Sequence, residues 1–462
     1  MLDKMLLSEV LRKTMLRGAD YADVFVENKK TTFIHLEDEK VEKVVTGAYS
    51  GVGIRLISKG KTFYAYGNDL SAGALMEIAG TLTDAASGAT RDLVLDLKKG
   101  KTRTDFRIKM PAGDIPVSRK IGLAKEADRT ARSFDGRIRQ VSASYRDSFQ
   151  KVLIATSEGT LIEDERTHTF FAVHVIASDK SMVQTGYETA GGHIGFELFD
   201  DLSAEELSLK ASGRAVMMLG AQRAPAGRMP VIISSEAGGT MIHEAIGHGL
   251  EADLARLGLS VYSGRLGEQV ASELVTVIDD ATLPYKRGSY RCDDEGTPSQ
   301  RTVLVDKGVL KGFMYDKLDA MLDGTRSTGN GRRESYQSRP IPRMSNTFVA
   351  PGSASPEEVL KSVHSGLLVR KMGGGQVNTV TGDFVFEVQE GYRIENGSVG
   401  EPVREATLTG NGPDVIKAID MVASDLGFSI GTCGKDSQGV PVSDAMPTLR
   451  ISEMVVGGEI KT

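Results

Sequence analysis

Residues 241–253 read MIHEAIGHGLEAD, and this stretch decides how the C-terminal half of the chain is organised. It places His243 and His248 five positions apart, with Glu244 directly after the first histidine. In zinc peptidases two neighbouring histidines hold the metal, and a glutamate beside the first of them is the general base. The stretch therefore predicts a metal-binding helix with these three residues in those roles.

The spacing of the two histidines does not suit a regular α-helix. On such a helix His243 and His248 would lie about 140° apart, too far for both imidazoles to reach one zinc ion at about 2.0 Å. Gly247 stands directly before the second histidine, and a π-bulge or a break costs least at a residue without Cβ. We expect the backbone to depart from the α-helix here.

A catalytic zinc ion needs a third protein ligand and an open position for water. The chain offers Cys292, Cys433, five further histidines and many carboxylates, and spacing alone does not choose among them. Glycines beside Cys433 would let a loop present its thiolate, and Lys435 would favour the ionised thiol. Two of the histidines, His168 and His174, occur without a motif and are expected to be packed or surface residues of a sheet.

Three alternatives remain open on these residues. The two histidines and the glutamate could be unrelated polar residues on a surface helix. A closed structural zinc site in a scaffold or regulatory protein would need a further cysteine or histidine nearby, and none lies within 40 residues of 243–248. A nucleic-acid-binding module is suggested by the arginines of 326–343, but the net charge of −6 provides no general attraction for phosphates. In a peptidase these arginines could bind substrate carboxylates or a partner subunit.

Length and composition predict a globular protein of several domains. At 462 residues the chain exceeds one usual hydrophobic core, and 40% hydrophobic with 26% charged residues excludes disorder as its main state. No apolar run is long enough to cross a membrane, and residues 1–16 predict an amphipathic helix, not a signal peptide. Two cysteines are too few for a disulfide framework, so we expect a cytoplasmic location.

The order of patterns along the chain predicts an α+β fold. We expect an N-terminal α/β sandwich-like region and then a mostly antiparallel β catalytic domain with a metal-binding helix. A basic stretch at 98–109 and the turn residues of 224–227 suggest three parts: residues 1–100, 110–222 and 228–462. Predicted helices cover 1–16, 70–87, 117–133, 202–219, 356–365 and 413–424. Predicted strands cover 21–27, 31–36, 52–57, 62–66, 138–145, 150–156, 160–174, 175–187 and 229–234.

Several segments in the C-terminal half resemble the TldD/PmbA family, and specifically its metal-bearing TldD branch. In chain order they are HEAIGHGLEAD at 243–253, GNGRRESY at 329–336, PRMSNT at 342–347, GGGQVN at 373–378, EGY at 390–392, GNGP at 410–413 and GTCGK at 431–435. The N-terminal half is similar more loosely, through residues 22–23 and 51–55. The resemblance thus covers nearly the whole chain.

The resemblance implies a zinc-dependent peptidase that acts on unfolded or flexible polypeptides. It implies metal ligands at His243, His248 and Cys433, with Glu244 as the base. It also implies a homodimer, or a heterodimer with a paralogue that lacks the metal motif; this chain keeps the motif and is similar to the active partner. No membrane partner is expected, and nucleic acid is disfavoured.

The stretch Gly374, Gly375, Gln376 and Val377 is our candidate for substrate binding. It passes from a glycine-rich loop into a strand, and its bare backbone could pair with an extended peptide. Such pairing supplies affinity through main-chain hydrogen bonds and little sequence specificity.

Overall fold

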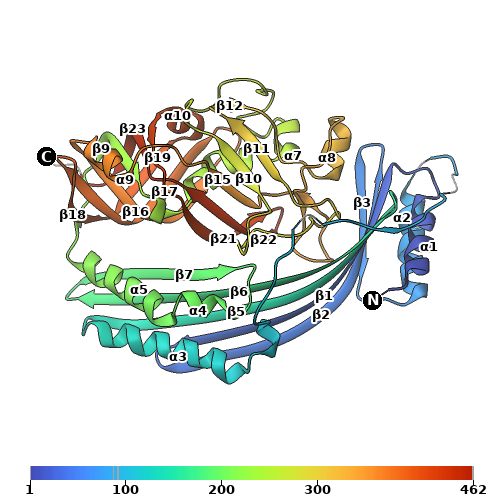
Figure 1. Ribbon diagram of the computed structural model, residues 1–462, viewed down its shortest axis with the longest axis horizontal. Helices are drawn as coiled ribbons and strands as arrows, with labels where there is room; N and C mark the ends of the chain where they lie inside the picture. Colours follow the sequence, from blue (N-terminus) through green and yellow to red (C-terminus); the bar gives the residue numbers. More distant parts are fainter. Residues whose placement is uncertain (1, 87, 91–92, 103, 460–462) are drawn as a thin grey trace.

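The structure is a computed structural model that describes residues 2–86, 88–90, 93–102 and 104–459. It has the predicted α+β fold. A long curved sheet from the N-terminal half lies along one side of a C-terminal part built on two large sheets, with a further pair of two short strands, residues 331–332 and 341–342 (Figure 1). None of the described helices is long and apolar enough to cross a membrane.

The N-terminal sheet has seven strands, in the order β3-β2-β1-β5-β6-β4, with β7 also paired to β6. All neighbours are antiparallel except β4 and β6. The elements of this half are α1 (Lys4–Met15), β1 (Tyr21–Glu37), β2 (Lys40–Ser58), β3 (Lys61–Gly67), α2 (Ala72–Ala85), β4 (Lys98–Lys99), η1 (Ala112–Asp114), α3 (Val117–Phe134), β5 (Ile138–Thr156), β6 (Thr160–Asp179), β7 (Met182–Gly192), α4 (Leu198–Asp201) and α5 (Ala204–Leu219).

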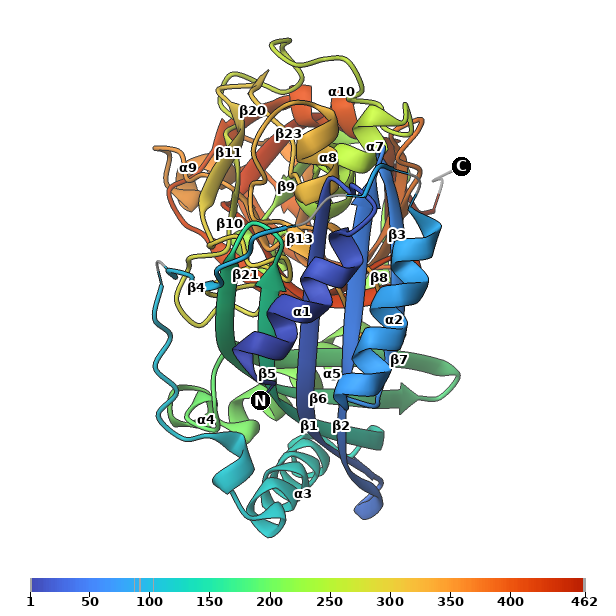
Figure 2. The ribbon, with the colours of Figure 1, turned by 90° about the vertical axis from the view of Figure 1, so that its right-hand side faces the viewer.

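Helices cover one face of this sheet, and the C-terminal part covers the other (Figures 1 and 2). Alternation along β1 explains the arrangement, because successive side chains of a strand point to opposite faces. Val24 packs in the core beneath α1 and α2, and Ile34 in the core beneath α3 and α5, whereas Phe25 packs against Cys292 and Tyr336. The same strands run through both helical cores, so the division into parts 1–100 and 110–222 stays a prediction.

Strand lengths were the weakest part of the sequence prediction. Two strands are continuous where the pattern predicts a pair: β1, predicted as 21–27 and 31–36, and β5, predicted as 138–145 and 150–156. The predicted boundary between 174 and 175 is wrong, because β6 continues to Asp179 and the turn follows at Lys180, where φ is 54°.

The C-terminal part contains a six-stranded sheet, β12-β11-β10-β15-β22-β21, and an eight-stranded sheet, β16-β9-β23-β19-β17-β18-β8, with β20 paired to β23. Its elements are β8 (Gln222–Arg223), β9 (Gly227–Ile233), η2 (Ser235–Ala237), α6 (Thr240–Ile242), η3 (His243–Gly247), η4 (His248–Leu250), α7 (Ala252–Arg256), β10 (Val277–Asp280), β11 (Arg301–Asp306), β12 (Val309–Leu310), α8 (Lys317–Leu322), β13 (Gly331–Arg332), β14 (Ile341–Pro342), β15 (Asn346–Val349), α9 (Pro356–Lys361), β16 (Ser365–Val377), β17 (Asp383–Glu395), β18 (Ser398–Arg404), β19 (Ala406–Asn411), α10 (Gly412–Lys417), β20 (Ile419–Val422), β21 (Gly427–Lys435), β22 (Gln438–Met446) and β23 (Leu449–Gly457).

The histidine-bearing segment lies in the core between these two sheets. Met241, Ile246 and Leu250 are fully buried there, so the motif is fixed by packing on both sides.

Two helices are shorter than predicted. The helix expected at 413–424 ends at Lys417, because residues 419–422 form β20 instead, and the helix expected at 356–365 ends at Lys361.

A buried network of charges joins the N-terminal sheet to the C-terminal part. Arg55 Nη2 lies 2.6 Å from Asp23 Oδ2 and 2.6 Å from Glu295 Oε1. Arg333, from the arginine-rich stretch 326–343, lies 3.2 Å from the other oxygen of Asp23. All four side chains are buried. The network therefore neutralises carboxylates that would otherwise be expensive to bury.

We expect Arg55→Met to lower the free energy of unfolding by about 3–5 kcal/mol, because it leaves Glu295 and part of the charge of Asp23 buried without a partner. Urea denaturation followed by tyrosine fluorescence measures this loss. The control is Arg223→Met, whose partners Glu405 and Glu459 are half-exposed. Exposed pairs contribute about 1 kcal/mol or less. Equal losses in the two variants would contradict the assignment.

Candidate metal centre

The two histidines lie on a π-helical turn. His243 begins η3, and the main-chain N–H of His248 donates to the carbonyl oxygen of His243. This i→i+5 bond is the definition of a π-helix, and it brings residues five apart onto one face. The ring centroids are 5.0 Å apart. The predicted departure from the α-helix is thus confirmed.

The structure leaves no room for a Cβ at Gly247, as predicted, and identifies the neighbour that excludes it. The φ of −55° and ψ of −58° of Gly247 are ordinary helical values, so backbone strain does not require glycine. A Cβ at this position would instead overlap Met344 Sδ, and one at Gly239 would overlap the main-chain nitrogen of Ala445. Both glycines allow close packing around the π-helical turn: Gly247 against Met344, between β14 and β15, and Gly239 against β22.

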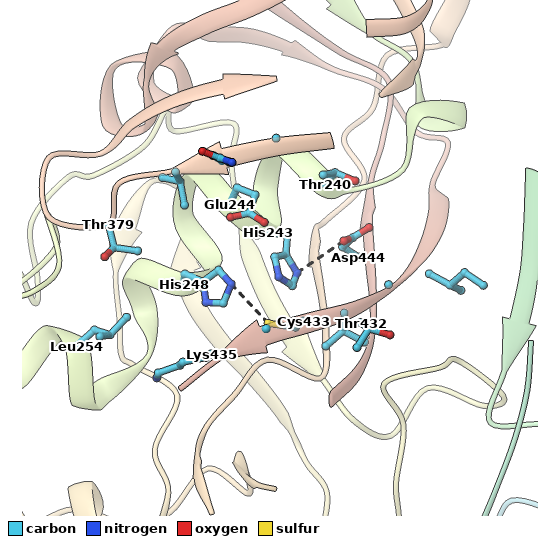
Figure 3. Close-up of a pocket in the computed structure, with 17 residues that line it drawn as sticks. Thr240, His243, Glu244, His248, Leu254, Thr379, Thr432, Cys433, Lys435 and Asp444 are labelled. Atoms are coloured by element: carbon cyan, nitrogen blue, oxygen red, sulfur yellow. Dashed lines mark hydrogen bonds and ion pairs between the residues drawn. The ribbon is translucent and has the colours of Figure 1, made fainter. Parts of the chain in front are cut away.

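The third predicted ligand, Cys433, lies opposite the histidines on β21 (Figure 3). Its Sγ is 3.5 Å from His248 Nε2, and one donor atom from each of Cys433, His243 and His248 lies within 4.8 Å of the other two. Cys292 lies elsewhere, in the apolar cluster with Phe25, where burial raises the pKa of its thiol. The fold therefore brings Cys433 together with the two histidines and leaves Cys292 apart from them.

Two buried carboxylates lie behind the histidines. Glu251 Oε2 is 3.0 Å from His248 Nδ1, and Asp444 Oδ2 is 3.6 Å from His243 Nδ1. Carboxylates in this position fix the tautomer and orientation of histidines that hold a metal. Neither residue is among the functional residues predicted from the sequence. Glu251 could have been found from its place three residues after His248, whereas Asp444 on β22 has no local signal.

The electrostatics favour an ionised thiol at Cys433. Burial would raise its pKa, but hydrogen bonds and charges from His243 and His248 outweigh burial and lower the pKa to about 5. Lys435 acts differently from the prediction. Its Nζ lies 3.1 Å from Glu251 Oε2 and 2.7 Å from an oxygen of Asp253, so it stabilises the carboxylate behind His248 and the neighbouring Asp253.

Glu244 lies beside His243, on the side away from Cys433 (Figure 3). It lines a cavity of about 570 Å³ together with both histidines and the cysteine. Burial raises the pKa of its carboxyl group, although the charges of the two histidines act in the opposite direction. A carboxylate with a raised pKa is a stronger base once ionised.

Strands with open edges line this cavity. β21 is the last strand of its sheet. Residues 375–377 of β16 pair with β17 along one edge, and no described strand pairs with the other, since β9 contacts β16 only at 367–369. Gly375, Gln376 and Val377 line the metal cavity, and Gly374 lines an adjoining hollow that reaches β7.

The other histidines and arginines considered in the sequence lie outside the metal centre and contact other parts of the fold. His168 Nε2 lies 3.2 Å from the carbonyl oxygen of Arg287, and burial lowers its pKa. His174 packs beside Tyr187. Within 326–343, three of the five arginines are buried, which keeps them from a nucleic-acid backbone: Arg332, Arg333 and Arg343.

Comparison with known families gives matches along nearly the whole chain. Three models match in order: PmbA/TldA metallopeptidase domain 1 at residues 22–89, the central domain at 111–219 and the C-terminal domain at 226–458. The chain is 38% identical to a metalloprotease TldD homolog of Haemophilus influenzae, covering 96% of this chain and 94% of that protein. A zinc metalloprotease TldD homolog of Saccharolobus solfataricus is 31% identical over 70% of this chain and 72% of its own length.

Solved structures share the fold. A putative modulator of a DNA gyrase from Thermotoga maritima superimposes with a TM-score of 0.82 at 23% identity, over 98% of this chain and 99% of that one. TldE from Thermococcus kodakarensis gives 0.78 at 18% identity, over 98% and 100%. At these identities the likeness concerns the architecture alone.

Proposed function

The chain belongs to the TldD/PmbA family of metallopeptidases, and from this premise we propose that it is a zinc-dependent peptidase of unfolded or flexible polypeptides. The observation that carries the proposal is the convergence of His243, His248 and Cys433 on one point, with Glu244 beside them in the same cavity. A structural site would not need a carboxylate base next to an open cavity.

The residues suit a zinc ion. Two imidazoles and a thiolate are ligands that zinc prefers, and three protein ligands leave one position for reaction. The Nδ1 atoms of His243 and His248 face Asp444 and Glu251, while one donor atom of each imidazole and the thiol of Cys433 lie within 4.8 Å of one another. A relative carries the word zinc in its name. When bound, the ion supplies Lewis acidity that polarises the peptide carbonyl and makes water a better nucleophile.

The chain's own residues then perform the proton transfers. Glu244 takes the proton of the attacking water and returns it to the leaving amine, which are the two roles of a general acid–base group. Glu251 and Asp444 hold the imidazoles in a fixed orientation. Lys435 keeps Glu251 ionised: burial would raise the pKa of Glu251, but Lys435 and His248 lower it to about 2.

The peptide would bind as an extended strand. Gly374, Gly375, Gln376 and Val377 offer an open strand edge on one side of the cavity, and β21 offers another on the opposite side. Main-chain hydrogen bonds to such edges require an extended, unfolded substrate and depend little on its side chains.

A peptide with N-methyl groups at alternate backbone positions should be cleaved at least about tenfold less efficiently than its parent, because each methyl removes a main-chain donor worth roughly 1 kcal/mol. Steady-state kcat/KM values measure the loss. A peptide with the same composition in scrambled order should keep its rate within a few fold. Strict dependence on side-chain order, with no effect of N-methylation, would contradict strand pairing.

The direct test of the function combines metal analysis with digestion of an unfolded protein. We expect about one zinc per chain, cleavage of reduced and denatured proteins, loss of cleavage on chelation and recovery with zinc. One bound zinc and no hydrolysis of any unfolded chain would favour the alternative, a zinc-containing scaffold or regulatory protein.

We also propose a dimer, either of two copies or with a metal-free paralogue, on the basis of the family relationship. Light scattering of the purified chain at micromolar concentration should give twice the mass of one chain. A monomer would exclude the homodimer and leave pairing with a paralogue.

We also propose a cytoplasmic location, with which the two free cysteines are consistent.

A further inference from the structure

The N-terminal sheet faces β21 (Figure 1), and several positive side chains line hollows in this region. Two adjoining hollows, of about 390 and 210 Å³, share Lys29, His168, Arg287 and Thr432 in their walls. Thr432 also lines the cavity of the metal centre and directly precedes Cys433. The side chains of Thr432 and Cys433 point to opposite faces of β21, so Thr432 is the wall that the hollows share with the metal cavity.

Four cations around these hollows have no carboxylate partner among the described residues: Lys29, Arg146, Arg287 and Arg332. Arg332 is 6% exposed, and its guanidinium donates only to main-chain oxygens. Arg287 donates to one main-chain oxygen at 3.2 Å and otherwise packs over an aromatic ring. Of the four, Arg332 is buried, Lys29 and Arg287 are half-buried and Arg146 is exposed. A cation withdrawn from water is normally paired, so Arg332 and Arg287 lack an anion.

The acidic side chains in the walls do not supply that anion. Asp147 pairs with Lys120 at 2.5 Å, and Asp294 pairs with Arg166 at 2.5 Å. Glu334 is exposed and accepts a main-chain N–H at 2.9 Å. The excess of positive charge therefore remains around the hollows.

The cations also act on one another. Burial, together with the charges of Arg146 and Arg332, lowers the pKa of Arg287 to about 10. Mutual repulsion of this kind destabilises the protein unless a ligand of opposite charge enters. An anion in the hollow would remove the repulsion and gain charge-assisted hydrogen bonds.

We propose that the hollow binds a carboxylate of the substrate peptide, with Arg287 and Lys29 as its main contacts. The inference rests on the proposed peptidase function, because Thr432 connects the hollow with the cavity in which the peptide would lie. The carboxylate is either the C-terminal group of the peptide or an acidic side chain close to the cleaved bond. The first source would direct cleavage to positions near the C-terminus.

Binding of labelled peptides to Glu244→Gln protein tests the site without catalysis. Three peptides share one uncharged sequence and carry an N-terminal fluorophore. One ends in a free carboxylate, one in an amide, and one in an amide with glutamate as its last residue. By fluorescence anisotropy, a carboxylate should strengthen binding roughly 10- to 100-fold over the plain amide. The peptide that gains affinity identifies the source of the carboxylate.

Matched variants locate the effect. Arg287→Gln should abolish the preference for a carboxylate, and Lys29→Gln should reduce it. The side chain of Lys29 makes no hydrogen bond or ion pair within the described residues and lies 5.9 Å from the centre of the Tyr49 ring. Its variant therefore keeps the test valid even if Arg287→Gln does not fold. Arg301→Gln, at an exposed position on β11, should leave the preference unchanged.

Equal affinities for the three peptides, including no binding of any, would overturn the proposal, as would a preference that persists in both Arg287→Gln and Lys29→Gln. The outcome is separable from the peptidase function. Carboxylate preference in a protein that never hydrolyses peptides would refute the function alone. Hydrolysis by the parent protein without any preference would refute the carboxylate site alone.

Discussion

Glu244→Gln should retain zinc and lose about two to four orders of magnitude in kcat, because general acid–base groups contribute that much and glutamine cannot accept a proton. The substitution keeps the size and hydrogen-bonding ability of the side chain. Glu244 lies beside His243 and not at the point where the three donor atoms converge, so metal content should stay near one per chain. Metal analysis and turnover of an unfolded protein, measured on the same preparation, check both parts.

The matched control is Glu401→Gln, which changes the same atoms at an exposed position on β18. It should keep both zinc and turnover. Loss of zinc in Glu244→Gln would make Glu244 a ligand and not the base. Turnover within tenfold of the parent would remove it from the proton transfer altogether, and another cavity carboxylate, Asp444, would become the candidate.

The sequence predicted the backbone of the motif because the constraint there is local. Two histidines five residues apart cannot face one point on a regular α-helix, and the structure has a π-helical turn at 243–247. The neighbour that excludes a Cβ at Gly247 is Met344, 97 residues later in the chain. Packing partners of this kind follow from the tertiary fold and leave no local pattern.

Strand periodicity was informative only where one face is buried. Residues 40–49 of β2 are exposed on nearly every side chain, so no alternation of apolar and polar residues marks them, and this half of the strand was missed. At the metal centre, too, contacts between distant parts of the chain leave no pattern in the sequence. Asp444 acts through its neighbour in space, His243, and the unpaired cations of the hollow come from β1, β5, β13 and the loop before Ser289.

We expect Cys433→Ser to lose zinc and activity together, whereas Cys292→Ser should keep both. A serine hydroxyl is a poor zinc ligand at neutral pH, while the thiol of Cys433 is already ionised through its contacts with the histidines, with a pKa of about 5. Removing a residue that only hydrogen-bonds to a metal ligand weakens metal binding roughly 10- to 100-fold. Removing the ligand itself should weaken zinc binding by more than this. Competition with a chelator measures the affinity.

The pH dependence of zinc binding follows from the same contacts. Burial lowers the pKa of His248, but Glu251 and Cys433 outweigh it and raise the pKa well above its usual value, so the metal-free protein carries a proton on this histidine at neutral pH. Zinc must displace that proton. Binding should therefore release protons into the buffer, and affinity should rise with pH and fall steadily as pH decreases from neutral towards 5. Calorimetry in buffers of different ionisation enthalpy counts the protons.

The distance from the metal to sulfur decides between the two cysteines. X-ray absorption of the zinc-loaded protein should show one sulfur at about 2.3 Å, which is the usual length of a zinc–thiolate bond. The signal should persist in Cys292→Ser, because Cys292 lies in the apolar cluster with Phe25 and Tyr336. It should vanish in Cys433→Ser loaded with excess zinc. A spectrum of the parent protein explained by nitrogen and oxygen alone would exclude both cysteines and leave a carboxylate, Asp444 or Glu244, as the third ligand.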